Sequence, residues 1–320
     1  MLDPRRLVLL ATVARHASLT QAAGELGYSA SALSQQIAAL EREAGATVLE
    51  RLPRGVRLTD AGRALAAAGE RVAAELRDAR AALEALGDLQ AGTLRVAAFA
   101  SAWNALVPDA VTAFRAAHPQ VELALLEAEP PEALAALRAG DLDVAVVFTT
   151  GDAQEQPDLE LDALGRDPLH AVLPRGHRLA GRRRIALSAL AEEAWVQPTR
   201  ACAALVQAAC ERAGFTPRTA FASDDYGAIQ GFVAAGAGVA LIPALALGER
   251  RRDVAVLPLA PPVPARGLVA ARRRRSRSPA ADALVERLRA AAAARAGGGA
   301  SGPHGAGTDA RTTIDERPAR

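Results

Sequence analysis

Several features that would assign this chain to a familiar class are missing from its sequence. It has 320 residues but only two cysteines, Cys202 and Cys210, too few for the disulfide framework of a small secreted domain. No secretory signal is visible in the stretch 1–15, and no apolar run approaches the ~20 residues of a membrane span. We therefore expect a soluble cytoplasmic protein with no membrane partner.

The sequence also has no motif that would make it an enzyme. It contains no Walker phosphate loop, no Gly-x-Ser-x-Gly elbow and no cluster of metal ligands, and its five histidines are scattered. We expect no catalytic residues, no metal and no cofactor. An exported solute-binding module is a further alternative, but such a module would need an export signal.

Strong positive charge, which would indicate nucleic-acid binding, is nearly absent. The formal net charge is +2, and residues 1–90 contain 11 arginines against 11 acidic residues. The positive charge is local, because Arg51, Arg54 and Arg57 lie within seven residues that contain no acid. These arginines would be the phosphate partners of bound DNA.

Near its start the sequence contains two short capped helices in succession. Ser18 begins a Ser-x-x-Gln capping box, which predicts a helix that Gly27 ends as a left-handed residue. Ser29 is placed to cap a further helix that runs to about Ala44. Two helices joined by a three-residue turn with glycine form a helix-turn-helix, here predicted over 18–37.

A wing and a long helix are expected to follow. Two short segments, 47–49 and 56–58, flank a turn with proline and glycine and predict a two-stranded wing, which completes a DNA-binding domain over 1–59. Thr59 then caps a long helix over 60–90, whose apolar residues form the narrow stripe of a coiled-coil seam. We expect this linker to pair two chains, with packing on its own domain as the alternative.

After residue 91 strands alternate with helices, which is typical of βαβ units around a buried sheet. Two such sets predict two lobes with a ligand cleft between them. The domain spans 91–294, with lobe I at about 92–162 and 266–294, lobe II at about 165–262, and a disordered tail at 295–320. The predicted strands are 93–98, 121–127, 142–148, 169–173, 218–222, 239–242 and 266–271, and the predicted helices are 103–117, 131–139, 201–213, 226–235 and 280–294. The fold class is multidomain α+β.

The stretch Leu7–Gly62 resembles the LysR-type transcriptional regulators. The matching residues, in order and without gaps, are 18–23 with Leu26, 29–37, Leu40-Glu41, 49–51, 54–59 and Ala61-Gly62. Weaker similarity continues to about Arg289, notably over 140–145 and 233–243. The resemblance implies a ligand-responsive regulator that binds double-stranded promoter DNA as a homodimer or homotetramer. It also implies a small-molecule effector, unidentified by the sequence, in a domain that resembles periplasmic binding proteins.

Six residues are expected to contact DNA, and they are Ser29, Ser31, Ser34, Gln35, Arg51 and Arg54. A recognition helix reads base edges from its first turns, and glutamine makes paired hydrogen bonds to adenine. The start of the helix suits a phosphate, and the wing arginines suit phosphate or the minor groove. Where the family often has Gln-Pro this chain has Ala30-Ser31, and Gln35 replaces a common arginine. We therefore predict an atypical operator.

Five residues at strand ends and helix starts are expected to contact the effector, and they are Ser101, Thr149, Thr199, Arg200 and Asp224. Arg200 suits a carboxylate. Asp224 either accepts from an amine or hydroxyl or caps a helix, and we favour the cap. Pro130-Pro131 stand where many relatives have a ligand-binding threonine, which predicts an unusual effector.

Two further features have a structural and a functional interpretation. Cys202 and Cys210 are eight residues apart on one predicted helix, about 12 Å along its axis, which is beyond disulfide reach. The peroxide-sensing branch of the family has a cysteine pair nearby, but its first cysteine aligns with Ala201, so we favour two buried small residues over redox sensing. The basic run of Arg272–Arg275 with Arg277 is interpreted as an exposed loop rather than a DNA contact.

Overall fold

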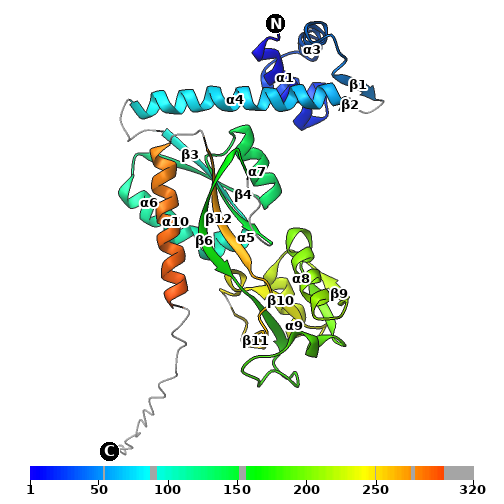
Figure 1. Ribbon diagram of the computed structural model, residues 1–320, viewed down its shortest axis with the longest axis vertical. Helices are drawn as coiled ribbons and strands as arrows, with labels where there is room; N and C mark the ends of the chain where they lie inside the picture. Colours follow the sequence, from blue (N-terminus) through cyan, green and yellow to red (C-terminus); the bar gives the residue numbers. More distant parts are fainter. Residues whose placement is uncertain (53–54, 87–91, 151–155, 249, 275–277, 299–320) are drawn as a thin grey trace, which may run out of the picture.

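In the computed structural model the described residues are 1–52, 55–86, 92–150, 156–248, 250–274 and 278–298. They form an elongated molecule in which one long helix, α4, lies between a small N-terminal domain and a larger two-lobed domain (Figure 1). Lobe I lies below α4 and lobe II lies at the far end of the molecule (Figure 1). None of the described helices is long and apolar enough to cross a membrane.

The N-terminal domain is a winged helix-turn-helix. Its elements are α1 (Pro4–His16), α2 (Leu19–Leu26), α3 (Ala30–Ala44), β1 (Leu49–Leu52) and β2 (Gly55–Leu58). Ser18 Oγ accepts a hydrogen bond from the backbone N–H of Gln21, and Ser29 Oγ accepts one from that of Ala32. Gly27 ends α2 with a φ of 68°. The predicted caps are therefore confirmed, and they fix where each helix begins and ends.

Helix α4 (Asp60–Leu86) is both a linker and part of the N-terminal domain. It packs so closely along α1 that a Cβ placed on Gly69 would lie 2.0 Å from the carbonyl oxygen of Leu7. In the predicted seam, Leu65 and Ala68 pack against the N-terminal core, whereas Leu76 is 66% exposed. The first part of the stripe thus packs on its own domain, as the alternative interpretation had it, and the exposed apolar surface begins further along.

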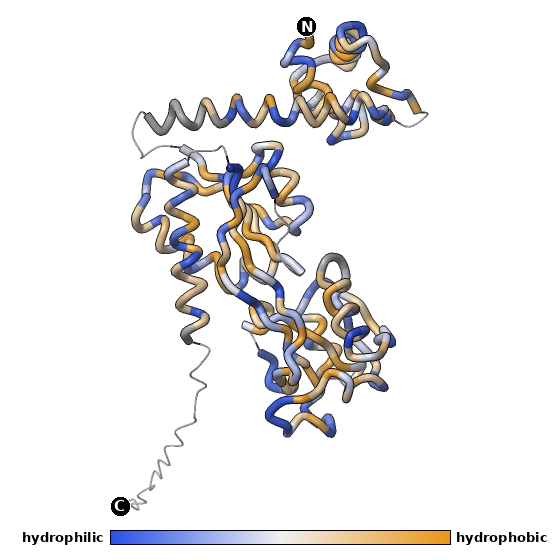
Figure 2. Tube along the Cα trace, viewed as in Figure 1, coloured by the Kyte–Doolittle hydropathy of each residue, from blue (hydrophilic) through white to orange (hydrophobic). Residues whose placement is uncertain are grey.

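Lobe I is a five-stranded sheet with helices on both faces. Its elements are β3 (Gly92–Ala98), α5 (Ala100–Ala105), α6 (Val107–Ala117), β4 (Val121–Glu127), α7 (Pro130–Ala139), β5 (Val144–Thr149), β6 (Leu159–Asp167), β12 (Arg266–Arg273) and α10 (Pro279–Gly298). The strand order is β4-β3-β5-β12-β6, and β12 runs antiparallel to both of its neighbours. Helices α6 and α10 pack together on one side, and α7 covers the other (Figure 1). Apolar residues run along its strands, as they also do in lobe II and in the N-terminal domain (Figure 2).

Lobe II is smaller and is built from two short sheets. Its elements are β7 (Leu169–Pro174), η1 (Leu187–Leu190), β8 (Ala194–Gln197), α8 (Arg200–Arg212), β9 (Arg218–Ala222), α9 (Tyr226–Ala234), β10 (Ala240–Pro243), η2 (Ala244–Leu247) and β11 (Val254–Pro258). The sheets have the orders β10-β7-β11 and β8-β9. The chain passes from lobe I to lobe II after β6 and returns before β12. The predicted lobe boundary at 162–165 falls inside β6.

The elements differ from the prediction in three ways. The predicted helix over 103–117 is two helices, α5 and α6, because Pro108 occupies the first turn of a new helix. Strands β6, β8 and β11 are not predicted from the sequence: charged residues interrupt β6, and β8 and β11 have only four and five residues. Helix α10 continues to Gly298, so the tail predicted to begin at 295 starts inside a helix. Residues 299–320 lie outside the described part of the chain.

Candidate DNA-reading helix and effector cavity

Helix α3 presents a polar edge to solvent in its first two turns. Its buried residues are Leu33, Ile37 and Leu40. On the other side Ser31 and Gln35 are exposed and Ser34 is half-buried. Ser29 is exposed at the cap, and its Oγ lies 3.0 Å from Ser31 Oγ. The structure therefore brings these four predicted residues together on one accessible edge.

The wing is the antiparallel ribbon of β1 and β2. Arg57 on β2 is exposed and forms an ion pair with Glu50 at 2.5 Å. The side chain of Arg51 and the whole of Arg54 lie outside the described part of the chain. Their predicted contacts with DNA stay predictions.

A cavity of about 1270 Å³ opens between the two lobes. Lobe I contributes α5 and the residues between β4 and α7, and lobe II contributes the starts of α8 and α9. Three predicted effector residues line it, namely Ser101, Thr199 and Asp224. Thr149 ends β5 and is not among the described lining residues. Arg200 begins α8, but its side chain lies outside the described part.

One wall of this cavity holds a buried ion pair. Arg266 begins β12 and Asp167 ends β6, and both side chains are 1% exposed. Nε and Nη2 of Arg266 donate to Asp167 Oδ2 at 3.0 and 2.5 Å. Arg266 also donates to Ser101 Oγ of lobe I at 2.9 Å and to Cys202 Sγ of lobe II at 3.5 Å. Asp167 Oδ1 accepts from the backbone N–H of Leu245. Through these hydrogen bonds the pair contacts both lobes, next to β6 and β12, where the chain passes from one lobe to the other.

The protonation states in this wall are fixed by burial and by neighbouring charge. Burial lowers the pKa of Arg266, but the opposing effects of Asp167, Cys202 and Tyr226 together hold the pKa above its ordinary value. Phe99 and Phe148 lie against the guanidinium, with ring centroids 5.0 and 4.7 Å from Cζ. Burial raises the pKa of the Tyr226 hydroxyl. Arg266 therefore stays charged and Tyr226 stays neutral near pH 7.

Asp224 does not cap helix α9, and our prediction of a cap there is wrong by one residue. Asp225 is the cap, since its Oδ1 accepts from the backbone N–H groups of Gly227 and Ala228 at 2.7 and 3.3 Å. Asp224 Oδ1 instead accepts from the backbone N–H of Thr199 at 3.1 Å. Thr199 is the cap position of α8, so Asp224 links the starts of the two helices.

Sequence reasoning missed the ion pair and its neighbour Tyr226. Asp167 and Arg266 are 99 residues apart, so no local spacing connects them. The only available signals were an arginine at the start of an apolar strand and an acid directly before Pro168. Either signal alone is more typical of a loop than of a buried pair.

Both cysteines are buried, as predicted. Cys202 lines the cavity beside Arg266, whereas Cys210 lies in the core of lobe II. Burial raises the pKa of the Cys210 thiol to about 12, and the charge of Glu211 adds to this effect. Cys210 is therefore protonated and a poor nucleophile near neutral pH.

We expect Cys210 to resist alkylation while the protein is folded. Because its pKa of about 12 lies far above neutral pH, thiolate is scarce, and reactivity rises only as the pH approaches that value. Labelling with iodoacetamide at about pH 8, followed by mass spectrometry, should modify Cys210 in urea but not in buffer. Rapid labelling in buffer, or a Cys202–Cys210 linkage after mild peroxide, would contradict this expectation.

The arginine run at the end of β12 is not the exposed loop that we predicted. Arg272 and Arg273 are the last residues of the strand, and Arg273 is only 9% exposed. Arg273 Nη1 donates to the carbonyl oxygens of Leu137 and Leu142, and Arg272 pairs with Asp162 at 3.0 Å. Arginine is tolerated at buried positions when carbonyl oxygens or carboxylates accept from its guanidinium. The part of the run beyond residue 274 lies outside the described residues.

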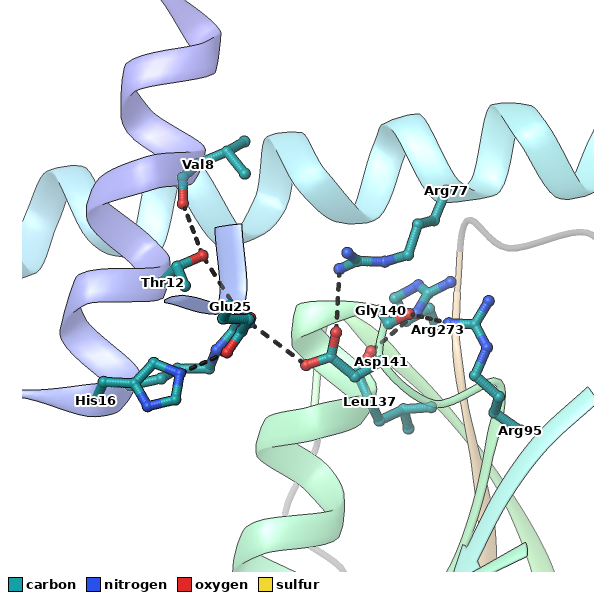
Figure 3. A network of polar contacts seen from close by, with 11 residues as sticks. Val8, Thr12, His16, Glu25, Arg77, Arg95, Leu137, Gly140, Asp141 and Arg273 are labelled. Atoms are coloured by element: carbon teal, nitrogen blue, oxygen red, sulfur yellow. Dashed lines mark hydrogen bonds and ion pairs between the residues drawn. The ribbon is translucent and has the colours of Figure 1, made fainter. Parts of the chain in front are cut away.

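One carboxylate of lobe I lies between two N-terminal elements (Figure 3). Asp141 follows α7, and its oxygens are 3.7 Å from Arg15 Nη1 on α1 and 3.7 Å from Arg77 Nη2 on α4. The adjacent Gly140 packs so closely on α4 that a Cβ there would lie 3.0 Å from Ala74 Cα. Lobe I is therefore in contact with both the N-terminal domain and the linker helix.

Glu25 extends this contact into the helix-turn-helix. It lies on α2 and pairs with Arg15 at 2.7 Å and with His16 at 2.5 Å (Figure 3). The hydrogen bond from His16 lowers the pKa of Glu25. Asp141 of lobe I is thus connected to α2 through a single arginine.

Together these features define a class of protein. A winged helix-turn-helix with an accessible recognition helix is joined through a long helix to a two-lobed domain with a cavity, which is the architecture of a ligand-responsive DNA-binding regulator. Among the described residues, no group of three or more His, Cys, Asp or Glu is placed to hold a metal ion.

Comparison with known proteins identifies the family. Residues 4–63 match the model of the bacterial regulatory helix-turn-helix protein, lysR family, and residues 87–293 match the LysR substrate binding domain. The chain is 30% identical over 288 residues to an uncharacterized HTH-type transcriptional regulator, YfeR of Shigella flexneri, covering 89% of this chain and 92% of that protein. It therefore belongs to the LysR family and is a ligand-responsive DNA-binding transcriptional regulator.

Solved structures of full-length regulators share its fold. A full-length OxyR variant from Pseudomonas aeruginosa superposes with a TM-score of 0.70 at 23% identity, covering 90% of this chain and 95% of that one. Full-length CbnR complexed with its target DNA superposes with a TM-score of 0.59 at 23% identity, covering 91% of this chain and all of that one. At these identities the likeness concerns the fold.

Proposed function

We propose that this regulator reads its promoter site with the exposed edge of α3 and with the wing. The observation that carries the proposal is the placement of Ser31, Ser34 and Gln35 on one accessible edge of a helix whose other side is packed in the core. Gln35 suits paired hydrogen bonds to adenine, and the serines suit several bases. The phosphate contacts proposed are those of Ser29, Arg51 and Arg54.

Pairing of two chains through α4 completes the DNA-binding unit in this proposal. Leu76 is 66% exposed on α4, where a second copy of the helix would cover it. A twofold dimer requires a roughly palindromic site, and a tetramer would extend the contact along bent DNA. CbnR, which is similar in fold, has been solved with its target DNA. We place the protein in the cytoplasm with the chromosome and assign it no catalytic reaction, because its family consists of transcriptional regulators.

The effector is proposed to bind in the cavity between the lobes. Ser101, Thr199 and Asp224 line this cavity and are the contacts that geometry supports, whereas Thr149 and Arg200 remain proposals from the sequence. A ligand that contacts both lobes favours one angle between them. A change in that angle reaches the N-terminal domain where Asp141 and Gly140 of lobe I meet α1 and α4.

A Gln35→Ala variant tests the proposed DNA contact. A bidentate base contact discriminates by about 1–3 kcal/mol, so the variant should bind the specific site about 5- to 150-fold more weakly. Gel shifts with the promoter region of its own gene measure the effect, and binding to random DNA should be unchanged. Gln207→Ala is the matched control, because Gln207 is exposed on α8 of lobe II. Equal weakening on specific and random DNA would count against base readout by Gln35.

A further inference from the structure

We propose that an arginine-rich loop of lobe II is a second DNA-binding surface, which contacts the phosphates of duplex beyond the stretch that α3 of the same chain reads. The loop spans 175–184, between β7 and η1, and we call it the arginine loop. The inference goes beyond the proposed promoter reading, because phosphate contacts hold DNA without reading its sequence.

The arginine loop presents positive charge that the protein does not neutralise. The stretch 175–191 contains five arginines and no acidic residue. Three of the arginines are consecutive, Arg182–Arg184, and all three are exposed and form no ion pair with any other described residue. Of the other two, Arg178 pairs with Glu193 at 3.2 Å, and Arg175 donates to a backbone carbonyl oxygen. The run 182–184 is therefore available to an anionic partner.

The other arginine runs of the chain are engaged within the protein to a greater extent. In the run that ends β12, Arg272 pairs with Asp162 and Arg273 donates to two backbone carbonyl oxygens. In the run before β11, Arg251 pairs with Asp253 at 2.7 Å. Guanidinium groups held in this way are less free to turn toward a partner. The arginine loop differs from both runs because its three consecutive side chains all face solvent.

The backbone on both sides of these arginines is anchored to lobe II. Leu179 packs against the core of lobe II, and Ile185 is part of that core. The N–H of Ile185 donates to the carbonyl oxygen of Pro258 at 3.2 Å, and its carbonyl oxygen accepts from Ala260 at 2.8 Å. The N–H of Leu179 donates to Nδ1 of His177 at 3.2 Å. A partner therefore meets a loop whose backbone is already ordered, which lowers the entropic cost of binding.

Duplex DNA is the anionic partner that these observations favour. A duplex carries one negative charge per about 1.7 Å of its axis, and the planar guanidinium makes paired hydrogen bonds to phosphate oxygens. Residues 1–90 contain as many acidic residues as arginines, 11 of each, so the reading domain brings no net positive charge to DNA. Four of its arginines form ion pairs inside the domain, and they are Arg6, Arg15, Arg57 and Arg63. Further neutralisation of phosphates has to come from elsewhere in the chain, and the arginine loop can supply it.

The position of the loop indicates which part of the DNA it contacts. Helix α3 lies at one end of the elongated molecule and lobe II lies at the other (Figure 1). The loop is therefore placed to contact duplex away from the stretch at α3, which bending of the DNA would bring to it. Such contacts offset the cost of deforming the duplex. The inference thus predicts that the regulator stabilises bent DNA from its sensor domain as well as from its helix-turn-helix.

A triple variant, Arg182→Gln, Arg183→Gln, Arg184→Gln, tests the proposal on the full chain. Gel shifts measure its affinity for a promoter fragment of about 150 base pairs, one persistence length, over a range of salt concentrations. Each lost phosphate contact reduces the salt dependence by about 0.9 in log–log slope, so the slope should fall by about 2–3. The affinity in about 0.1 M salt should fall at least about tenfold. On a duplex of about 20 base pairs, which spans only the DNA at the reading helices, the variant should bind like the wild type.

A second triple variant is the matched control. Arg115→Gln, Arg166→Gln, Arg287→Gln removes the same charge from lobe I, where these arginines are exposed and form no ion pair with any described residue. We expect it to bind both DNA lengths like the wild type. The melting temperatures of both triple variants should stay close to that of the wild type, since all six positions are on the surface.

A tethered cleavage reagent locates the DNA beside the loop. Because Cys202 and Cys210 are both buried, an Arg183→Cys variant can be labelled at its new thiol with an iron–EDTA group that cleaves nearby DNA. We expect cleavage of the long fragment outside the stretch that the reading helices protect.

The proposal is overturned if the two triple variants bind the long fragment with equal affinity and equal salt slope. It is also overturned if the tethered group cleaves no DNA outside the protected stretch. A variant of the loop that binds DNA like the wild type but fails to regulate transcription in vitro would assign the loop to an acidic protein partner instead. Gln35→Ala should weaken specific binding without changing the salt slope, so a failure of the proposed promoter reading is distinguishable from a failure of this inference.

Discussion

An Asp167→Ala variant is expected to lose about 3–5 kcal/mol of folding stability in the two-lobed domain. The loss arises because Arg266 and Asp167 are both 1% exposed, so removing the carboxylate leaves a guanidinium charge buried without its partner. The backbone N–H of Leu245 also loses its acceptor. Thermal and urea unfolding of the wild type and the variant measure the difference.

A double variant provides the control for this prediction. In Asp167→Leu, Arg266→Met both charges are replaced by apolar side chains, and such replacements of a buried pair are often neutral or stabilising. We therefore expect the double variant to be more stable than Asp167→Ala. Asp158→Ala removes a partly exposed partner of Arg138 and should cost no more than about 1 kcal/mol. If Asp167→Ala costs no more than Asp158→Ala, the buried pair does not hold the lobes together.

A Gly69→Ala variant in helix α4 is also expected to lose much of the folding stability of the N-terminal domain. A Cβ at this position would lie 2.0 Å from the carbonyl oxygen of Leu7 and 2.4 Å from its carbonyl carbon, so α1 and α4 would have to move apart. Overpacking of this kind costs about 1–3 kcal/mol, and the upper end applies because backbone, not a flexible side chain, must give way. The melting temperature of the N-terminal domain should fall, and specific DNA binding should weaken with it.

Gly24→Ala is the matched control within the same domain. Gly24 lies inside helix α2, and a Cβ there would have nothing within 4 Å. Alanine loses less conformational entropy than glycine in a helix, so this change should stabilise the domain by about 0.4–1 kcal/mol. If Gly69→Ala lowers the stability of the domain and Gly24→Ala raises it, the close approach of α1 and α4 at Gly69 causes the loss, and the removal of a glycine as such does not. Two effects of the same sign would contradict this account.

The N-terminal domain could be predicted from the sequence because its signals are local. Ser18, Gly27 and Ser29 each act on a backbone group within a few residues, and the structure confirms all three. The exposed edge of α3 could be predicted for the same reason, since a helical period fixes which residues face away from Leu33 and Ile37.

The sensor domain was less predictable because its decisive contacts are long-range. Asp167 meets Arg266 across 99 residues, and Arg273 reaches the carbonyl oxygen of Leu137 across 136. Arg272 and Arg273, which we expected in a solvated loop, end strand β12, where groups from distant segments accept hydrogen bonds from them. We predicted Asp224 as the cap of α9, but the structure has Asp225 there, so even a local signal can miss the cap by one residue.

The strand order of lobe I also sets the order in which the chain can fold during synthesis. Strand β12 lies between β5 and β6, yet β5 ends at Thr149 and β12 begins only at Arg266. The ribosome must therefore release the whole of lobe II before the sheet can close, whereas the winged helix-turn-helix and the part of α4 that packs on it are synthesised long before β12. A nascent chain that has not reached Arg266 has a DNA-reading domain without a finished sensor.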